Sequence, residues 1–451
     1  MAGGTRGGPA RVATLRRDLL ARNPNTVTLL AGDFLSPSAL STARLDGERL
    51  EGRQMVAVLN SLGVDYATFG NHEFDLREAA FFDRLREAEF GALSVNVVSR
   101  DGTPLPGVRP HVILRYGDGR GGTLRVAVFG VTMDRDQSAY ASIAEPLGPA
   151  AAHARLLRDS ADVIVALTHL PLAQDIALAE TVPGIDLVLG GHEHENLQIR
   201  RGNDLTPIAK ADANFRTVFV HDLWWDPEGR RLDVSSRLVA ITDSIRDEPA
   251  TLAVAARWVE TAYRGFRDAG FQPESTVARL PIEMDGREST VYRDTSALTV
   301  AIADAMLAEV AGADGVLYNA GSIRLDDVLA AGTVSQYDII RILPFGGPVL
   351  EVEMTGSLLQ RVLEQGERNR GTGGYLQRAR IDRLESGWSV GGTPLVDARR
   401  YRLAVSEFLI SGREQGLDFL SRENPGLTVS RPHRDIRFAL IDLLRARYGL
   451  D

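Results

Sequence analysis

The sequence predicts an α/β protein made of two folded parts. Up to about residue 245, apolar strand-like runs alternate with helix-like segments, and four of these runs end in polar tips. A charged stretch from 249 to 269 has helical apolar spacing, and a second set of strand-like and helix-like segments follows it within the 451 residues. A chain of this length suggests two or three domains with buried cores.

The first part is expected to open with a helix at residues 12–20 and to close with strands at 217–221 and around 232–241. Between them lie four strands, each followed by a polar residue: residues 26–30 with Asp33, 66–69 with Asn71, 163–167 with His169, and 187–189 with His192. In open α/β sheets, ligands bind outside the carboxyl ends of the strands, so these tips are expected to converge. Imidazole nitrogens and the oxygens of Asp and Asn suit first-row divalent metals. The pattern therefore predicts a metal site.

Each tip taken alone has a simpler interpretation. A Gly-Asp pair such as the one at Asp33 is usually a turn. A lone histidine at a strand end is more often a hydrogen-bonded structural residue. His192 and His194 alternate along an extended segment and could lie on a polar surface. The combination of four tips in one α/β pattern favours a shared metal site.

At these residues the sequence resembles the calcineurin-like metallophosphoesterases and, among them, the 5′-nucleotidase family. The most specific run is Gly-Asn-His-Glu-Phe-Asp at residues 70–75. The resemblance covers nearly the whole chain. It implies a four-layer α-β-β-α metallophosphoesterase domain over residues 1–246, a linker helix over 247–271, and an α+β substrate-binding domain over 272–451.

The resemblance also implies roles for the polar tips. Two divalent ions of the Mn, Zn or Fe class are expected, and sequence does not choose among these metals. Asp33 is implied as the carboxylate that bridges the two ions. Asn71, His169 and His192 are implied as the further ligands of the second ion, and His194 faces the first ion. His72 matches the histidine that stabilises the transition state and leaving group, and Asp75 matches the acid that orients it.

One element of the family pattern is missing. The family begins with a strand that ends in Asp-x-His and supplies two ligands to the first ion. Here the Gly-Gly-Pro-Ala-Arg run at residues 7–11, which follows that strand in the family, has no Asp or His before it. Either the sequence starts late or is a fragment, or the protein has lost its first metal site. As written, the first ion could count only Asp33 and His194.

The second part carries its own motifs. Strands expected at 316–318 and 401–405 lead into residues 319–324 (Asn-Ala-Gly-Ser-Ile-Arg) and 406–409. These resemble the carboxy-terminal domain of 5′-nucleotidases, which implies that Asn319 and Arg324 contact substrate and that Phe345 and Phe408 sandwich the base. Stacking on an aromatic ring contributes roughly 1–3 kcal/mol per base. Without the resemblance, core packing is the simpler interpretation of the two rings.

Three departures from the family leave base and sugar preference open. The usual triple glycine is Ala-Gly-Ser at residues 320–322. The arginine expected before the first helix of this domain is matched by Arg293, one residue out of step. The aspartate after the second aromatic residue corresponds by spacing to Glu414.

Composition excludes several classes of function. The net charge of −9, without any basic run, argues against nucleic-acid binding. The absence of cysteine excludes disulfides and thiol catalysis. The sequence has no apolar run of about 20 residues, so it predicts no membrane span. Arginine carries nearly all the positive charge, and Lys210 is the only lysine. No signal peptide is visible; the compartment and the oligomeric state stay open.

The expected function is metal-assisted hydrolysis of nucleoside 5′-monophosphates or related nucleotides. Two alternatives remain. The chain could act on another ester, such as a nucleotide-sugar diphosphate, a cyclic nucleotide or a sulfur ester. It could also bind nucleotides without catalysis, because the first metal site is incomplete.

Overall fold

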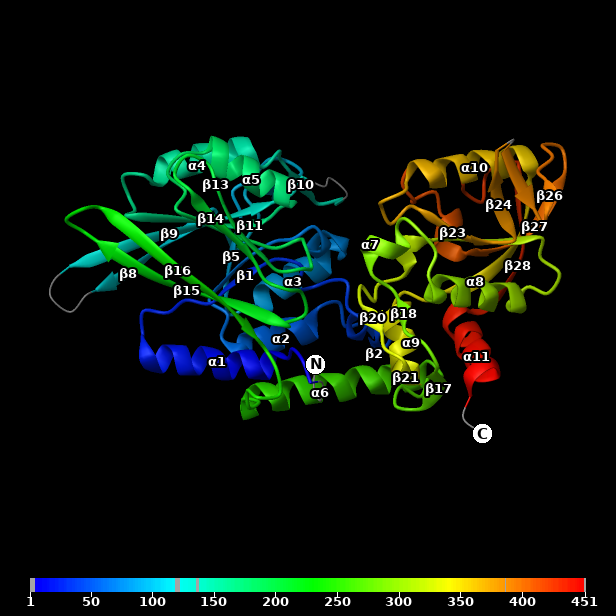
Figure 1. Ribbon diagram of the computed structural model, residues 1–451, viewed down its shortest axis with the longest axis horizontal. Coiled ribbons are helices and arrows are strands. Elements are labelled where there is room, and N and C mark those ends of the chain that lie inside the picture. Colours follow the sequence, from blue (N-terminus) through cyan, green and yellow to red (C-terminus); the bar gives the residue numbers. More distant parts are fainter. Residues whose placement is uncertain (1–4, 118–121, 135–137, 386, 450–451) are drawn as a thin grey trace. The chain divides into compact units, whose positions relative to one another are not determined.

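The computed structural model describes residues 5–117, 122–134, 138–385 and 387–449. The chain divides into two compact units, Met1–Ala262 and Tyr263–Asp451. The division falls within helix α6 (Pro249–Asp268) (Figure 1). The sequence-based assignment of a linker at 247–271 between domains at 1–246 and 272–451 remains a prediction.

Unit 1 contains two main β-sheets. The first is entirely parallel, in the order β1 (Leu29–Ala31), β4 (Tyr66–Thr68), β5 (Gly91–Leu93) and β7 (Val108–Arg109). The second has a parallel centre with one antiparallel strand at each edge. Its order is β13 (Leu197–Arg201), β14 (Thr206–Lys210), β12 (Leu187–Gly190), β11 (Val163–His169), β9 (Thr123–Thr132) and β8 (His111–Gly117).

Helices cover the outer face of each sheet (Figure 1). Helices α1 (Pro9–Arg22), α2 (Arg53–Leu62) and α3 (Glu78–Glu87) share a core with the first sheet. Helices α4 (Leu147–Leu157) and α5 (Leu172–Thr181) share one with the second. A third cluster joins the inner faces of the two sheets. The four-layer α-β-β-α arrangement expected for the first part is therefore present.

Strand β11 shows how the layers orient the site. Successive side chains of a strand point to opposite faces. Val163, Val165 and Leu167 belong to the cluster between the sheets, whereas Ile164 and Ala166 pack beneath the helices. His169 continues the first series, so its ring points toward the first sheet. The buried pattern on both faces is typical of a parallel strand covered on both sides.

The remaining elements of unit 1 are a long hairpin and short connecting segments. The hairpin pairs β15 (Thr217–Asp226) with β16 (Arg231–Ala240). The short segments are η1 (Leu40–Thr42), β2 (Arg44–Leu45), β3 (Glu48–Arg49), η2 (His72–Asp75), β6 (Val97–Ser99) and β10 (Ala141–Ile143).

Unit 2 is built on a five-stranded mixed sheet. Its order is β23 (Leu376–Ala379), β19 (Gly315–Asn319), β27 (Arg400–Ser406), β22 (Pro348–Thr355) and β28 (Leu427–Asp435). The helices are α7 (Glu288–Val291), α8 (Ala297–Glu309), α9 (Gln336–Ile342), α10 (Gly356–Arg368) and α11 (Ile436–Tyr448). Smaller elements are β17 (Thr276–Leu280), β18 (Met284–Asp285), η3 (Ala320–Ser322), β20 (Val328–Leu329), β21 (Gly332–Ser335), β24 (Ile381–Leu384), β25 (Gly387–Val390), β26 (Thr393–Pro394) and η4 (Glu407–Ile410).

The strand expected at residues 26–30 begins later, as β1 (Leu29–Ala31). The Thr26 hydroxyl donates to the carbonyl of Asn23 at 2.6 Å, and the Asn23 side chain accepts from the N–H of Asn25 at 3.0 Å. These local bonds hold a turn, and side-chain bonds of this kind compete with strand pairing.

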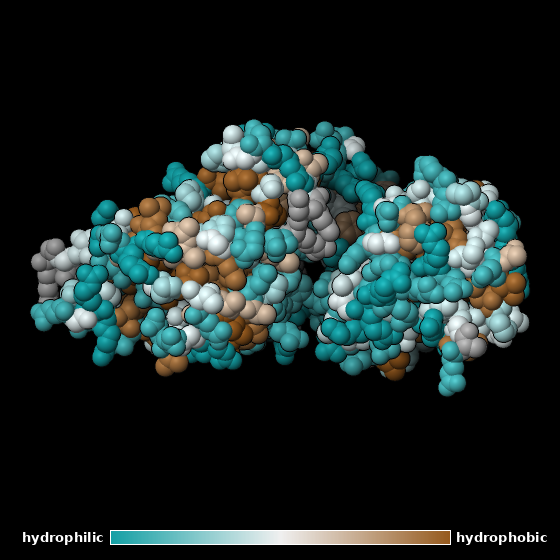
Figure 2. Space-filling view, turned by 90° about the horizontal axis from the view of Figure 1, so that it is seen from above, coloured by the Kyte–Doolittle hydropathy of each residue, from teal (hydrophilic) through white to brown (hydrophobic). Residues whose placement is uncertain are grey.

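The outer surface is mainly hydrophilic on the face shown in Figure 2, with apolar residues interspersed among polar ones. Among the helices of the described ranges, none has both the length and the apolar character that a bilayer crossing requires.

Phe81 should be a strong contributor to the stability of unit 1. Its ring is fully buried. The centroid of this ring lies 5.4 Å from the ring centroid of Phe69, 5.5 Å from that of Phe74 and 5.3 Å from that of Tyr140. We expect Phe81→Ala to lower the free energy of unfolding by roughly 3–5 kcal/mol in urea denaturation. Leu156→Ala is the control, because Leu156 is 65% exposed. Equal losses in the two variants would contradict this assignment.

Candidate metal centre and substrate site

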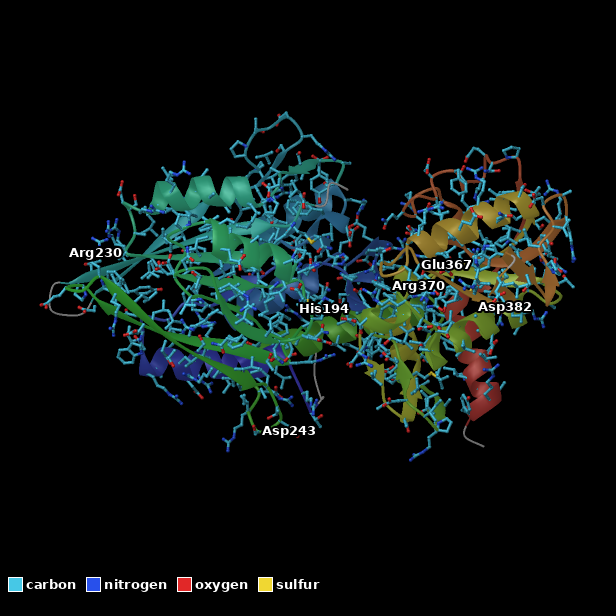
Figure 3. The ribbon with its side chains drawn as sticks, turned by 45° about the horizontal axis from the view of Figure 1, so that its top comes forward. His194, Arg230, Asp243, Glu367, Arg370 and Asp382 are labelled. Atoms are coloured by element: carbon cyan, nitrogen blue, oxygen red, sulfur yellow. The ribbon has the colours of Figure 1, made fainter. Side chains whose placement is uncertain are left out.

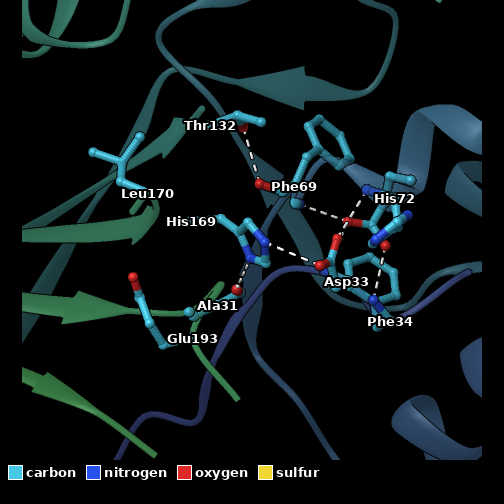
Figure 4. Close-up of polar contacts among 12 residues, drawn as sticks. Ala31, Asp33, Phe34, Phe69, His72, Thr132, His169, Leu170 and Glu193 are labelled. Atoms are coloured by element: carbon cyan, nitrogen blue, oxygen red, sulfur yellow. Dashed lines mark hydrogen bonds and ion pairs between the residues drawn. The ribbon is translucent and has the colours of Figure 1, made fainter. Parts of the chain in front are cut away.

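Asp33 lies at the end of β1, where it meets residues from two other strand ends (Figure 4). One carboxylate oxygen, Oδ2, is 3.0 Å from Nε2 of His169, and the other accepts the N–H of His72 at 2.9 Å. Burial alone would raise the pKa of Asp33, but its close contact with His169, with a smaller contribution from His72, lowers it to about 2. The carboxylate is therefore an anion at neutral pH.

The ring of His169 is fixed by the backbone of β1. Its Nδ1 lies 2.7 Å from the carbonyl oxygen of Ala31. Because a carbonyl can only accept, Nδ1 carries the hydrogen and Nε2 is the atom directed at Asp33. Nε2 is buried, and although it lies at ion-pair distance from the carboxylate, it has no aligned hydrogen bond. This is the orientation that metal-binding histidines usually have.

The strand ends pack against one another through glycine. A Cβ atom at Gly70 would lie 2.1 Å from Oδ1 of Asp33, and one at Gly191 would lie 2.2 Å from the carbonyl oxygen of Ala31. Neither distance is possible for a real side chain. The two glycines therefore allow the tips after β4 and β12 to approach the tip after β1.

Asn71 and His192 complete the group of converging tips. Asn71 is 6% exposed, and its Oδ1 is buried without a hydrogen-bond partner. The His192 ring centroid is 5.4 Å from that of His169. Burial, reinforced by the charge of His169, lowers the pKa of His192 to about 4, so its imidazole is neutral at pH 7. His192 has a backbone φ of 79° and Asp33 one of 54°, a conformation that costs energy and clusters at functional sites.

Glu73 holds two of these tips in place. One oxygen of its fully buried carboxylate accepts the N–H groups of Phe34 and Leu35 at 2.7 and 2.9 Å. The other accepts those of Asp33 and Gly70 at 2.8 and 2.6 Å. Burial and the charge of Asp33 raise the pKa of Glu73 to about 7. The run at residues 70–75 contained this glutamate, but sequence alone assigned it no role.

His72 and Asp75 are in direct contact within η2. The Nδ1 atom of His72 is 2.6 Å from Oδ2 of Asp75. The His72 side chain is largely buried, whereas 42% of the Asp75 side chain is exposed. The pair has the geometry of an oriented acid, and its catalytic role remains a prediction.

His194 lies on the exposed part of the loop after β12 (Figure 3). Its carbonyl accepts the N–H of Ala213 at 3.1 Å. Across the ranges that the structure describes, no group of three or more His, Cys, Asp or Glu side chains is arranged to hold a metal ion. In the centre of the site, Asp33 and His169 contact each other directly.

The donor set nevertheless fits a divalent ion. Two ligand atoms implied by the family are buried: Oδ1 of Asn71 has no hydrogen bond, and Nε2 of His169 has only its ion-pair contact with Asp33. They stand with an anionic carboxylate at Asp33 and a neutral imidazole at His192. Buried polar atoms of this kind call for an explanation, and an ion bound by all four side chains would supply one.

In unit 2, three predicted substrate residues lie at strand ends that meet at one edge of the sheet. Strands β19 and β27 are parallel, so Asn319, the last residue of β19, and Phe408, just after β27, lie at neighbouring ends. Val349 of β22 pairs with Ser406, which brings Phe345, just before β22, to the same edge. The two phenylalanines are 44% and 40% exposed. Rings so exposed at one edge are not ordinary core residues.

Cations accompany both rings. The Arg324 guanidinium lies 5.8 Å from the centre of the Phe345 ring, and that of Arg413 lies 5.5 Å from the centre of the Phe408 ring. Nε of Arg324 is buried without a hydrogen bond, and its terminal nitrogen is 3.9 Å from Glu288. Arg324 therefore has a donor available for an anionic or polar ligand.

The residues that depart from the family pattern each lie close to another residue of unit 2. The hydroxyl of Ser322, which replaces a glycine, donates to Oδ1 of Asn319 at 2.6 Å. A Cβ at Gly371 would lie 3.5 Å from the guanidinium of Arg293. One at Gly374 would lie 2.9 Å from the carboxylate of Glu414. The substrate roles of Arg293 and Glu414 remain predictions.

Comparison with known families agrees with both halves of this description. The calcineurin-like phosphoesterase family matches residues 5–196. The 5′-nucleotidase C-terminal domain matches residues 275–421. The chain belongs to the 5′-nucleotidase family. The resemblance inferred from the polar tips is thereby confirmed.

Curated members of the 5′-nucleotidase family are distant in sequence. The trifunctional nucleotide phosphoesterase protein YfkN of Bacillus subtilis is 26% identical over 83% of this chain, which spans only 28% of that protein. The snake venom 5′-nucleotidase of Naja atra is 24% identical over 82% of this chain and 74% of its own length.

Solved structures share the 5′-nucleotidase fold. A 5′-nucleotidase precursor from Thermus thermophilus superposes with a TM-score of 0.78 at 20% identity, over 99% of this chain and 92% of that one. The sulfate thiohydrolase SoxB from Thermus thermophilus gives 0.72 at 21% identity, over 98% and 81%. At such identities the likeness establishes the fold and no particular substrate.

Replacement of Glu73 should loosen the candidate centre. In Glu73→Gln, the amide nitrogen would face two of the four N–H donors now bound by the carboxylate. Each unsatisfied buried donor costs about 1–3 kcal/mol. We expect a large fall in the free energy of unfolding, measured in urea. Exposed Glu78→Gln is the matched control; a Glu73 variant as stable as this control would refute the clamp.

Proposed function

We propose that the protein is a metal-dependent phosphoesterase that hydrolyses nucleoside 5′-monophosphates or related nucleotides to nucleoside and phosphate. The observation that carries the proposal is the convergence of Asp33, Asn71, His169 and His192 in unit 1. Membership of the 5′-nucleotidase family agrees with it.

In this proposal the four converging side chains hold the second divalent ion, of the Mn, Zn or Fe class, and Asp33 and His194 contribute to the first. A bound ion of this kind supplies positive charge at the phosphoryl oxygens and lowers the pKa of water. The carboxylate of Asp33 provides the matching negative charge, and the neutral ring of His192 can bind without first losing a proton.

His72 acts as the proton donor. Asp75 engages its Nδ1 at 2.6 Å, which leaves Nε2 to donate to a phosphoryl or leaving-group oxygen. The backbone N–H of His72 is bound to Asp33, so the donor is tied to the same carboxylate that serves the ion.

Unit 2 recognises the nucleoside. The exposed rings of Phe345 and Phe408 offer faces for a base, and Arg324 offers a donor for an anionic or polar group. The hydroxyl of Ser322 occupies the amide oxygen of Asn319, so Asn319 presents its NH₂ group as a donor. These features favour a nucleotide over a sulfur ester that lacks a base.

A second candidate function is nucleotide binding without hydrolysis. The observation that favours it is the exposed position of His194, one of the two residues that the proposal assigns to the first ion. Metal content separates the two candidates: about two ions per chain supports the hydrolase, and at most one supports the binding protein.

Asp33→Asn should sharply reduce bound metal, because Asp33 is the only carboxylate among the four converging side chains. Elemental analysis after dialysis against Mn²⁺ or Zn²⁺ measures the effect. Asp159→Asn is the control, since Asp159 is exposed. Unchanged metal content in the Asp33 variant would exclude the proposed centre.

Phe345→Ala and Phe408→Ala should each weaken AMP hydrolysis by an amount corresponding to roughly 1–3 kcal/mol in kcat/KM, the contribution of one stacking face. Hydrolysis of an aryl phosphate without a base should change much less. Phe419→Ala provides a control in unit 2, because its partly buried ring packs on the core and beneath Arg361. Parallel losses on both substrates would mean that the rings are structural.

A further inference from the structure

The only lysine of the chain ends β14 with its side chain completely buried. Nζ of Lys210 lies 2.6 Å from the carbonyl oxygen of Leu170 and 2.9 Å from that of Gly191. It is also 2.8 Å from Oδ2 of Asp175 and in contact with the carboxylate of Glu193. One ammonium group therefore meets two backbone carbonyls and two carboxylates.

The side chain reaches these partners by crossing β12. Strand β12 lies between β14 and β11, and Gly190 of β12 pairs with Lys210 on one side and Thr168 on the other. A Cβ at Gly190 would lie 2.7 Å from Cε of Lys210. Because strands are about 4.8 Å apart, a group that links the ends of β14 and β11 needs a long side chain and a glycine beneath it.

Lys210, Asp175 and Glu193 form a polar network that contacts both sequence neighbours of His169. Thr168 comes just before this histidine, and its hydroxyl donates to Asp175 at 2.7 Å. Leu170 comes just after it, and its carbonyl is bound by Lys210. Asp175 is fully buried on α5, so the polar group is held from the helix side of the sheet.

The same network encloses both neighbours of His192. Gly191 precedes it and is bound through its carbonyl by Lys210. Glu193 follows it, contacts the ammonium, and accepts the N–H of Leu172 at 2.7 Å. Lys210 thus contacts the residues before and after His192 and the residue after His169.

Stability alone is a poor reason for such a network. Removing an ammonium and a carboxylate from water costs several kcal/mol per ion, and apolar residues of similar volume often serve as well or better. A rigid link between two ligand-bearing loops is a different matter, because metal affinity depends on how the ligands are held.

We propose that Lys210 is a positioning residue for the metal centre. Its ammonium, with Asp175 and Glu193, sets the separation and orientation of His169 and His192 for a divalent cation. The inference rests on the proposed function, because it presupposes that these histidines bind a metal.

The test compares Co²⁺ binding by the full chain and three variants. Lys210→Met removes the ammonium at similar length. Because this leaves two carboxylates unpaired, a second variant combines it with Asp175→Asn and Glu193→Gln. Arg125→Met is the control: it breaks the ion pair to Asp162, at 2.8 Å, which lies at the opposite, amino ends of β9 and β11.

Affinity is measured by titration calorimetry and ligand geometry by the visible absorption of bound Co²⁺, with thermal unfolding as the check on folding. We expect 10- to 100-fold weaker binding and an altered spectrum in both Lys210 variants, and unchanged binding in the control. Parent-like affinity and spectrum in a folded Lys210 variant would overturn the positioning role alone. Unfolding of both Lys210 variants would overturn it in favour of a purely structural role. A parent chain that binds no Co²⁺ would overturn the proposed function as well.

Discussion

Four backbone N–H groups donate to one buried carboxylate, and the candidate centre depends on that arrangement. Glu73 joins the turn after β1 to the turn after β4, and it stabilises the left-handed conformation of Asp33. With that turn fixed, the Asp33 carboxylate can meet His169 and the N–H of His72 together. Glu73 thus holds the loops of the first sheet that carry candidate metal ligands, and it need not contact a metal itself.

The two sheets hold their tips by different means. The first uses an anion that gathers backbone donors, and the second uses a cation that gathers backbone acceptors. Glu73 and Lys210 both lie beneath the tips, fully buried. Such complementary buried charges cost solvation energy, and they persist where several backbone groups share the benefit.

Much of the architecture could be predicted from sequence. Buried parallel strands are nearly continuous apolar runs, so β11 and β12 were readily found together with the polar residues that follow them. The family and the four-layer fold expected from those residues are confirmed. The late start of β1 is not evident from the apolar run, because the turn held by Thr26 depends on local side-chain bonds that compete with the strand.

The supporting contacts of the site could not be predicted in the same way. Glu73 stands within a recognisable run, but three of the four backbone donors it binds come from a segment about 40 residues away. Composition alone gives Lys210 no role, because it only marks this residue as the one lysine of an arginine-rich chain. Its one signal in the sequence is its place at the end of an apolar strand, and the crossing over Gly190 is visible only in the structure.

The enclosed lysine gives the chain an unusual chemical property. Apart from the α-amino group, the protein has a single primary amine, and the fold shields it from solvent. Reagents that acylate amines would therefore find almost nothing to modify on the native surface. Acylation of that amine requires the region around the end of β14 to open, so its rate measures local unfolding there, as hydrogen exchange does for amides. The single lysine thus reports on local unfolding next to His169 and His192.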